Sequence, residues 1–278
     1  MKKNYGLNLK KELADRKPED YQLGGTKKEC VALIPNEVRQ LYLPEGELQN
    51  IGEEKMDCVS RGFNNNLEAK FNYLLRNNLI PQTHLEFLQK NGYITPKGIE
   101  FSDAFVAINS QTTREGNSLI APIDAIHHSG LVPKSLLPQF PAFEEYHNPM
   151  RITQAILNLG LEFLTYFSIN YERVKEAEFK EFLKKDMIVL GGFAWPEAVN
   201  GVYPKTGNDF NHCYLDFSLP CYMAFDNYEE GSGDFIKKLA EDYDQTDFGY
   251  RTIVSLKELK KKQKEQSWWQ ELWEFLWS

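Results

Sequence analysis

Cysteine is scarce in this sequence: Cys30, Cys58, Cys213 and Cys221 are the only four among 278 residues. So few thiols, so widely spaced, exclude a disulfide-rich secreted scaffold, and we expect them to be free. A structural zinc site usually needs close ligand pairs, and the nearest pair, Cys213 and Cys221, has seven residues between its members. We therefore expect no metal and no other cofactor.

Long hydrophobic runs are also missing. The longest, residues 187–195, has about half of the roughly 20 residues that a membrane span needs. The first residues carry charge on both sides of Leu7 and contain no apolar stretch, which argues against a signal peptide. The sequence predicts a cytoplasmic chain without a transmembrane segment.

Basic residues are too few for a nucleic-acid binder. Lys and Arg number 32 against 40 Asp and Glu, which gives a net charge of −8. Binding to phosphates needs a basic face, so we expect no nucleic-acid partner. Hydrophobic residues make up 42% of the chain, which is too many for a disordered protein. At this length we expect one large domain or two small lobes.

Helical patterns dominate the first two thirds of the chain. Apolar residues recur every three or four positions from Cys58 to about residue 76, which predicts a helix with one apolar face and Asp57 as its N-cap. Further helices are predicted at about 83–92 and 117–128. The pair Asn148-Pro149 is expected to open a longer helix that runs through 163.

The pattern changes after about residue 185. Short β-branched and aromatic runs at 187–195, 211–217, 221–227 and 250–256 predict strands. Helices followed by strands indicate an α+β fold with a helical lobe and an antiparallel β lobe. We expect four regions: a segment packing on the lobes (1–48), the helical lobe (49–185), the β lobe (186–258) and an amphipathic aromatic helix (259–278).

Tryptophan is concentrated at the C-terminal end, where Trp268, Trp269, Trp273 and Trp277 lie within the last eleven residues. On a helix these residues form an apolar face too broad for a solvated terminus. We expect the segment to bind another protein or a second copy of this chain, because aromatic anchors contribute much of the affinity of interfaces. Packing on the chain's own helical lobe and binding to a membrane surface are the alternatives.

Three residues could together form a thiol active site. Cys58 opens a predicted helix, where the helix dipole favours a thiolate. His212 lies in one predicted strand and Asp226 at the end of the next, so antiparallel pairing would bring them together. A nucleophilic thiolate needs a proton acceptor and a group that orients it. A single Cys or His is more often structural, and the ordered set of three strengthens the catalytic interpretation without displacing the structural one.

The order of these residues resembles that in the papain-like cysteine peptidases. In that family a Cys at the start of the long helix of one lobe faces a His and an Asn or Asp from a β lobe. The segments that carry the resemblance are Gly130-Leu131-Val132-Pro133, Asn200-Gly201-Val202-Tyr203 followed by Asn211-His212, and Phe225-Asp226-Asn227-Tyr228. The divergent papain-like proteins encoded by bacteriophages are more similar still, through residues 43–49, 113–118 and 248–250. The resemblance covers about residues 4–256.

The resemblance implies a papain-like two-lobe fold, a peptide or protein substrate, and thiol hydrolase activity. Cys58 would attack, His212 would accept its proton, and Asp226 would orient the imidazole. Gln49, with the backbone N–H of Cys58, would hold the oxyanion. Tyr228 would replace the tryptophan that shields the His–Asn contact in the family, with Asn227 supporting it. A phage-encoded protein would act in the host cytoplasm or within the virus particle.

The sequence also departs from the family. Its C-G-S-C-W motif is replaced by Lys55-Met56-Asp57-Cys58-Val59, without the glycine. The carboxylate of Asp57 is expected to raise the pKa of the neighbouring thiol. Gln49 stands nine residues before Cys58, further than is usual. Two other functions therefore stay open: an inactive papain-like protein that is a structural or packaged virion component, and a thiol acyltransferase or amidase, because transglutaminase-like proteins share the Cys, His, Asp order.

Overall fold

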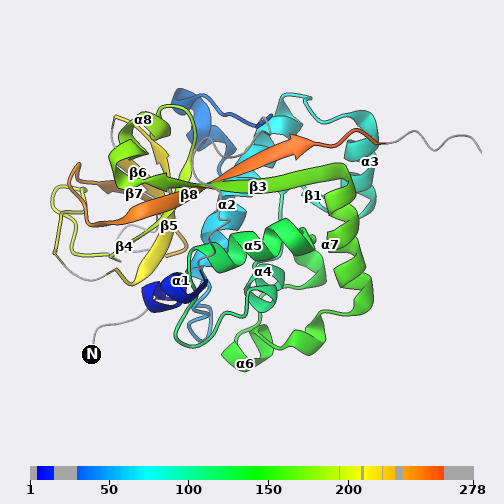
Figure 1. Cartoon of the computed structure of the whole chain (residues 1–278), viewed down its shortest axis with the longest axis horizontal. Helices are drawn as coiled ribbons and strands as arrows, with labels where there is room; N and C mark the ends of the chain where they lie inside the picture. The colour runs from blue at the N-terminus through cyan, green and yellow to red at the C-terminus, as the bar shows by residue number, and fades with distance from the viewer. Residues whose placement is uncertain are drawn as a thin grey trace, which may run out of the picture.

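The structure, a computed structural model, describes residues 5–15, 30–193, 195–207, 210–220, 222–228 and 234–259. It combines a group of helices with a six-stranded antiparallel sheet (Figure 1). The α-helices are α1 (Leu9–Asp15), α2 (Cys58–Arg76), α3 (Gln82–Lys90), α4 (Asp103–Asn109), α5 (Ile120–Ser129), α6 (Phe143–Tyr146), α7 (Gln154–Tyr166) and α8 (Phe179–Leu183). Short 3-10 helices are η1 (Asn36–Tyr42), η2 (Lys134–Leu136), η3 (Pro149–Arg151) and η4 (Glu176–Glu178). No helix in these ranges is long and apolar enough to cross a bilayer.

The large sheet has the strand order β3-β8-β4-β5-β6-β7. Its strands are β3 (Phe167–Lys175), β4 (Ile188–Gly192), β5 (His212–Ser218), β6 (Tyr222–Phe225), β7 (Ile236–Leu239) and β8 (Gln245–Leu256). A separate hairpin joins β1 (Ile94–Thr95) to β2 (Gly98–Ile99). Strands β5 and β6 pair with Leu215 opposite Phe225. This register places the start of β5 beside the residues that follow β6.

Helix α2 lies in the centre of the molecule, against β5 on one side and against α4 and α5 on the other (Figure 1). Its predicted apolar face is present, since Phe63, Leu67, Phe71 and Leu74 are fully buried. However, its polar side chains are buried as well, and they bind neighbouring elements. Lys70 forms an ion pair with Asp186 and also donates to the carbonyl of Thr252. The helix is therefore a central element rather than one with a solvated face.

Several element boundaries differ from the sequence predictions. Asn148-Pro149 opens only the 3-10 turn η3, and α7 begins at Gln154, because the Thr153 side chain accepts a hydrogen bond from the Ile156 N–H and caps that helix. The sheet already begins at Phe167, well before residue 186, because β3 pairs with β8 along its whole length. Asp57 precedes α2 without capping it through its side chain.

The predicted aromatic helix at 259–278, with Trp268, Trp269, Trp273 and Trp277, lies outside the described residues except for Leu259. Its proposed role in binding a protein partner stays a prediction. Cys221 also lies outside the described residues, whereas Cys30, Cys58 and Cys213 are free thiols.

The buried Lys70–Asp186 pair provides a test of how α2 is held against the sheet. Lys70→Met should lower the free energy of unfolding by about 3–5 kcal/mol, because it leaves the carboxylate of Asp186 buried without its cation. The double variant Lys70→Met/Asp186→Leu should recover most of this loss, because it removes both charges. Urea denaturation measures both values, and a single variant as stable as the wild type would show that the pair is not buried.

Candidate active site

His212 and Asp226 form a buried pair at the end of the β5–β6 hairpin. The Nε2 atom of His212 lies 2.5 Å from Oδ1 of Asp226, and both side chains are inaccessible to solvent. Because an ionised carboxylate can only accept a hydrogen bond, Nε2 carries a hydrogen and donates a hydrogen bond to Asp226. The other ring nitrogen, Nδ1, is buried and has no hydrogen-bond partner. The arrangement fixes the orientation of the ring and leaves Nδ1 without a partner.

Aromatic side chains enclose this pair. Trp195, which the sequence analysis did not single out, donates from its indole Nε1 to Oδ2 of Asp226. The rings of Trp195 and Tyr228 lie 5.8 and 5.2 Å from the His212 ring. Trp195 is the one tryptophan outside the C-terminal cluster, which is the signal that could have identified it. Both oxygens of Asp226 are thus bound, and water is kept from the pair.

Cys58 is the first residue of α2 and lies against the β5 strand that begins with His212. The backbone N–H of Cys213 donates to its sulfur. The thiol is fully buried, and burial, the Cys213 thiol and the Asp57 carboxylate raise its pKa well above the ordinary value. In this state Cys58 is a neutral thiol, even though it stands at a helix start.

A tight turn leads into Cys58. Met56 has a φ of 56°, in the left-handed region that favours glycine, and it occupies the position where the family motif has its glycine. Its backbone N–H donates to Oε1 of Glu54, 3.2 Å away. The turn is therefore retained without the glycine, at some cost in backbone strain.

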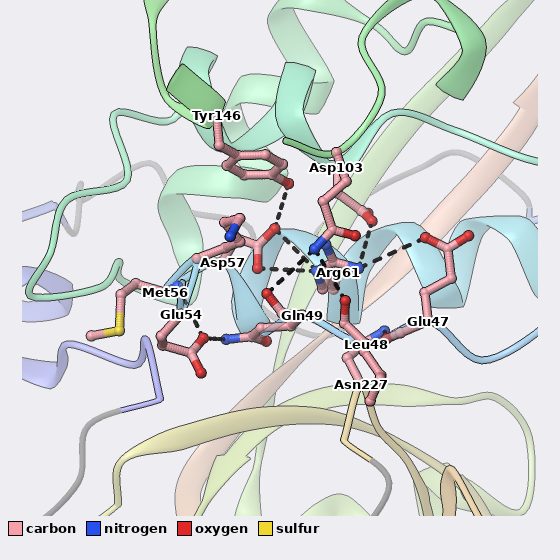
Figure 2. Close-up of polar contacts among 12 residues, drawn as sticks. Glu47, Leu48, Gln49, Glu54, Met56, Asp57, Arg61, Asp103, Tyr146 and Asn227 are labelled. Atoms are coloured by element: carbon pink, nitrogen blue, oxygen red, sulfur yellow. Dashed lines mark hydrogen bonds and ion pairs between the residues drawn. The ribbon is translucent and has the colours of Figure 1, made fainter. Parts of the chain in front are cut away.

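Gln49, the predicted oxyanion donor, is fully buried near this turn. Its Nε2 donates to the carbonyl oxygen of Tyr5 at 2.9 Å. The same nitrogen donates to Oε1 of Glu54 at 2.5 Å (Figure 2). Glu54 also accepts from the Tyr228 hydroxyl at 2.6 Å. The amide of Gln49 thus presents an N–H to a peptide carbonyl, and that carbonyl belongs to the chain itself.

Residues 5–8 cross the site between the turn before Cys58 and the start of β5. The Tyr5 N–H donates to the carbonyl of Asn211, the residue before His212, at 3.1 Å. Gly6 and Asn8 bind the backbone of Asn117 on either side, each at 2.8 Å. A Cβ on Gly6 would lie 2.5 Å from the carbonyl of Met56. The segment is therefore held by backbone hydrogen bonds and lies against Met56 and Asn211, the residues two before Cys58 and one before His212.

Asn227, predicted as a supporting residue, lies away from the His–Asp pair. Its side chain accepts from Asn65 Nδ2 and donates to the Glu47 carbonyl, both at 3.1 Å. Its carbonyl accepts from the Gln49 N–H. Asn227 thus connects the end of β6 to α2 and to the Gln49 segment.

Asp57, which the sequence analysis expected to cap the helix and to raise the pKa of the thiol, is paired with a cation. Both of its oxygens lie within 3.1 Å of Nε of Arg61, one turn along α2, and one of them accepts from the Tyr146 hydroxyl (Figure 2). The carboxylate is directed to these partners, which explains why it does not cap the helix.

Within the described residues, no group of three or more His, Cys, Asp or Glu side chains could hold a metal ion.

Comparison with known proteins finds similarity at the level of structure. No family model matches the sequence, and no curated protein sequence matches it. Among solved structures, the cysteine protease xylellain from Xylella fastidiosa aligns with a TM-score of 0.52 and 14% identity over 92% of this chain and 96% of that one. Procathepsin L2 from Tenebrio molitor aligns at 0.51 and 10% identity, over 91% and 78% of the two chains. ProCathepsin B S9 from Trypanosoma congolense aligns at 0.52 and 10%, over 91% and 87%.

At 10–14% sequence identity, this structural similarity establishes the fold alone. The prediction of an α+β chain with a helical part and an antiparallel sheet is confirmed, and the chain has the fold of the papain-like cysteine proteases.

Proposed function

We propose that the protein is a cysteine peptidase in which Cys58, His212 and Asp226 form the catalytic set. The observation that carries this proposal is the buried His212–Asp226 pair, whose second imidazole nitrogen has no partner, together with a free thiol at the start of the central helix that accepts a hydrogen bond from the backbone N–H of Cys213, the residue after His212. The similarity to cysteine proteases in fold supports it.

The reaction begins with a proton transfer. Nδ1 of His212 accepts the proton of Cys58, and the thiolate attacks the carbonyl carbon of a peptide bond. The imidazolium formed is stabilised by Asp226 and then gives its proton to the leaving amine, which leaves a thioester on Cys58. Water activated by His212 cleaves this thioester, which releases the acid and restores the thiol.

Gln49 is the side-chain donor for the oxyanion. Its Nε2 already binds one peptide carbonyl, that of Tyr5, in the closed structure. When a substrate replaces residues 5–8, the same N–H would face the oxygen of the scissile carbonyl. Glu54 keeps the amide in this orientation, because it accepts the second hydrogen of Nε2.

The described structure is the closed state of this site. Residues 5–8 bind the Gln49 amide and the Asn211 carbonyl, which a substrate backbone would need, and Cys58 has no exposed surface. Turnover therefore requires this segment to leave. Its departure would also hydrate the thiol and lower its pKa, because burial is the largest cause of the raised value.

The rival functions make different predictions. A thiol acyltransferase or amidase would use the same thiol but would transfer the acyl group to an added amine. An inactive virion component would neither label stoichiometrically at Cys58 nor cleave a peptide library. A bacteriophage origin, with action in the host cytoplasm or the virus particle, stays a prediction from the sequence.

Substitution of the catalytic set should abolish peptide cleavage. Cys58→Ala and His212→Ala should each lower kcat/KM by about 10⁴-fold or more, and the double variant no further, because the residues act as a unit. Asp226→Asn should keep more activity than Asp226→Ala, because the amide oxygen can still accept from Nε2 of His212. Cleavage of a fluorogenic peptide library measures these values. Normal activity in Cys58→Ala would contradict the assignment.

Displacement of residues 5–8 can be tested by the substitution Gly6→Ala, which adds one methyl group. Gly6 has a φ of +113°, and its added Cβ would collide with the Met56 backbone, so Gly6→Ala should displace the segment. Destabilising the closed state by about 1.4 kcal/mol would raise the rate of Cys58 alkylation by iodoacetamide about tenfold.

Gly207→Ala is the matched control for this test. Gly207 also has a positive φ, +67°, but nothing lies within 4 Å of its Cβ position. The control should alkylate at the wild-type rate. Equal rates in all three proteins would mean that residues 5–8 do not limit access to the thiol.

A further inference from the structure

A second buried cluster of charged side chains lies at the start of α2, around Arg61. The guanidinium of Arg61 is buried, and its Nε lies 3.0 and 3.1 Å from the two oxygens of Asp57. Its Nη1 lies 3.1 Å from Oδ2 of Asp103 at the start of α4, and Glu47 is 3.9 Å away. Figure 2 shows these acidic side chains pointing toward Arg61. Although burial opposes its charge, Asp57 and Asp103 raise the pKa of Arg61, so it stays a cation.

Asp57 is the member of this cluster that directly precedes Cys58 in the chain. From α6 it receives the Tyr146 hydroxyl, and its charge also acts on Lys55 and His147. Lys55 donates to the carbonyls of Ile51 and Pro141, so Arg61 is the cation in direct contact with Asp57. The pair joins residues one helical turn apart and so fixes Asp57 at the helix start.

The surroundings of Cys58 explain why this pair matters. The Cys213 thiol from β5, Asp57 from the same segment and Glu54 from the preceding turn oppose a thiolate at Cys58, whereas the backbone N–H of Cys213 favours it. In a buried site a unit charge acts more strongly than in water. An unpaired Asp57 would therefore hinder formation of the nucleophile, and a cation beside Asp57 offsets that effect.

We infer that Arg61 is a positioning residue of the thiol site, which acts by holding the Asp57 carboxylate as a neutralised pair next to Cys58. The inference rests on the proposed function, in which the thiolate of Cys58 is the nucleophile. Arg61 touches neither the thiol nor a substrate in this arrangement, and its effect passes through Asp57.

A pH titration of the thiol tests this inference. The ultraviolet absorbance of the thiolate is recorded for the full chain, and the same curve for a Cys58→Ser background is subtracted to isolate Cys58. Arg61→Met should move the midpoint up by about 1 pH unit, because Asp57 loses its cation. Arg61→Lys should restore part of the shift, because it returns the charge without the planar donor set.

Lys70→Met is the matched control, since it removes another buried, ion-paired cation from the same helix nine residues further on. It should lower stability without moving the thiol midpoint. A shift as large in Lys70→Met as in Arg61→Met would overturn the inference, because it would show only the effect of loosening α2.

Asp57→Asn keeps the test decisive if Arg61→Met does not fold. In this variant Arg61 retains Asp103 as its partner, and the carboxylate next to Cys58 is gone. The midpoint should fall below the wild-type value, and adding Arg61→Met to Asp57→Asn should move it little further, because the effect of Arg61 passes through Asp57. An unchanged midpoint in Asp57→Asn would overturn the inference. The titration needs no substrate, so a chain without peptidase activity would refute the proposed function and leave this result readable.

Discussion

Helix α2 is enclosed on every side, and the rest of the structure is arranged to satisfy the polar groups that it carries into the interior. Lys70 requires Asp186, Arg61 requires Asp57 and Asp103, and Asn65 requires Asn227. Each partner comes from the residue before the helix, from a neighbouring helix, or from a segment next to the sheet. Because an unpaired buried polar group is costly, these contacts fix the position of the helix. The position of Cys58 is fixed with it.

Two opposing effects act on the thiol at the helix start. The macrodipole favours an anion there by about 0.3–2 kcal/mol. Complete burial can cost the charged form of a group up to about 4–7 kcal/mol. Burial therefore prevails in the closed state, and the pKa of Cys58 is raised. In the proposed function the helix start favours the thiolate once residues 5–8 have left, which would link access to the site with ionisation of Cys58.

The groups that hold residues 5–8 are also the ones that would bind a substrate in the proposed catalysis. Gln49 Nε2 and the Asn211 carbonyl bind the backbone of Tyr5, and both are groups that any extended peptide could use. Recognition through backbone atoms does not depend on side chains, so a segment of the chain itself can occupy the site. The aromatic enclosure of His212 by Trp195, Tyr228 and Tyr5 then excludes water from the pair with Asp226.

Local periodicity and turn residues sufficed to predict the helix that begins at Cys58, four of the six strands of the large sheet and the α+β class. The antiparallel order of two strands also sufficed to place His212 beside Asp226. Only the tertiary structure decided the roles of Trp195, Tyr5 and Arg61. Their contacts join segments far apart in the chain, or, for Arg61 and Asp57, depend on burial that local pattern does not reveal. The prediction that Asp57 caps the helix was wrong for this reason: a carboxylate binds a buried guanidinium and a hydroxyl in preference to backbone N–H groups once folding has brought them within reach.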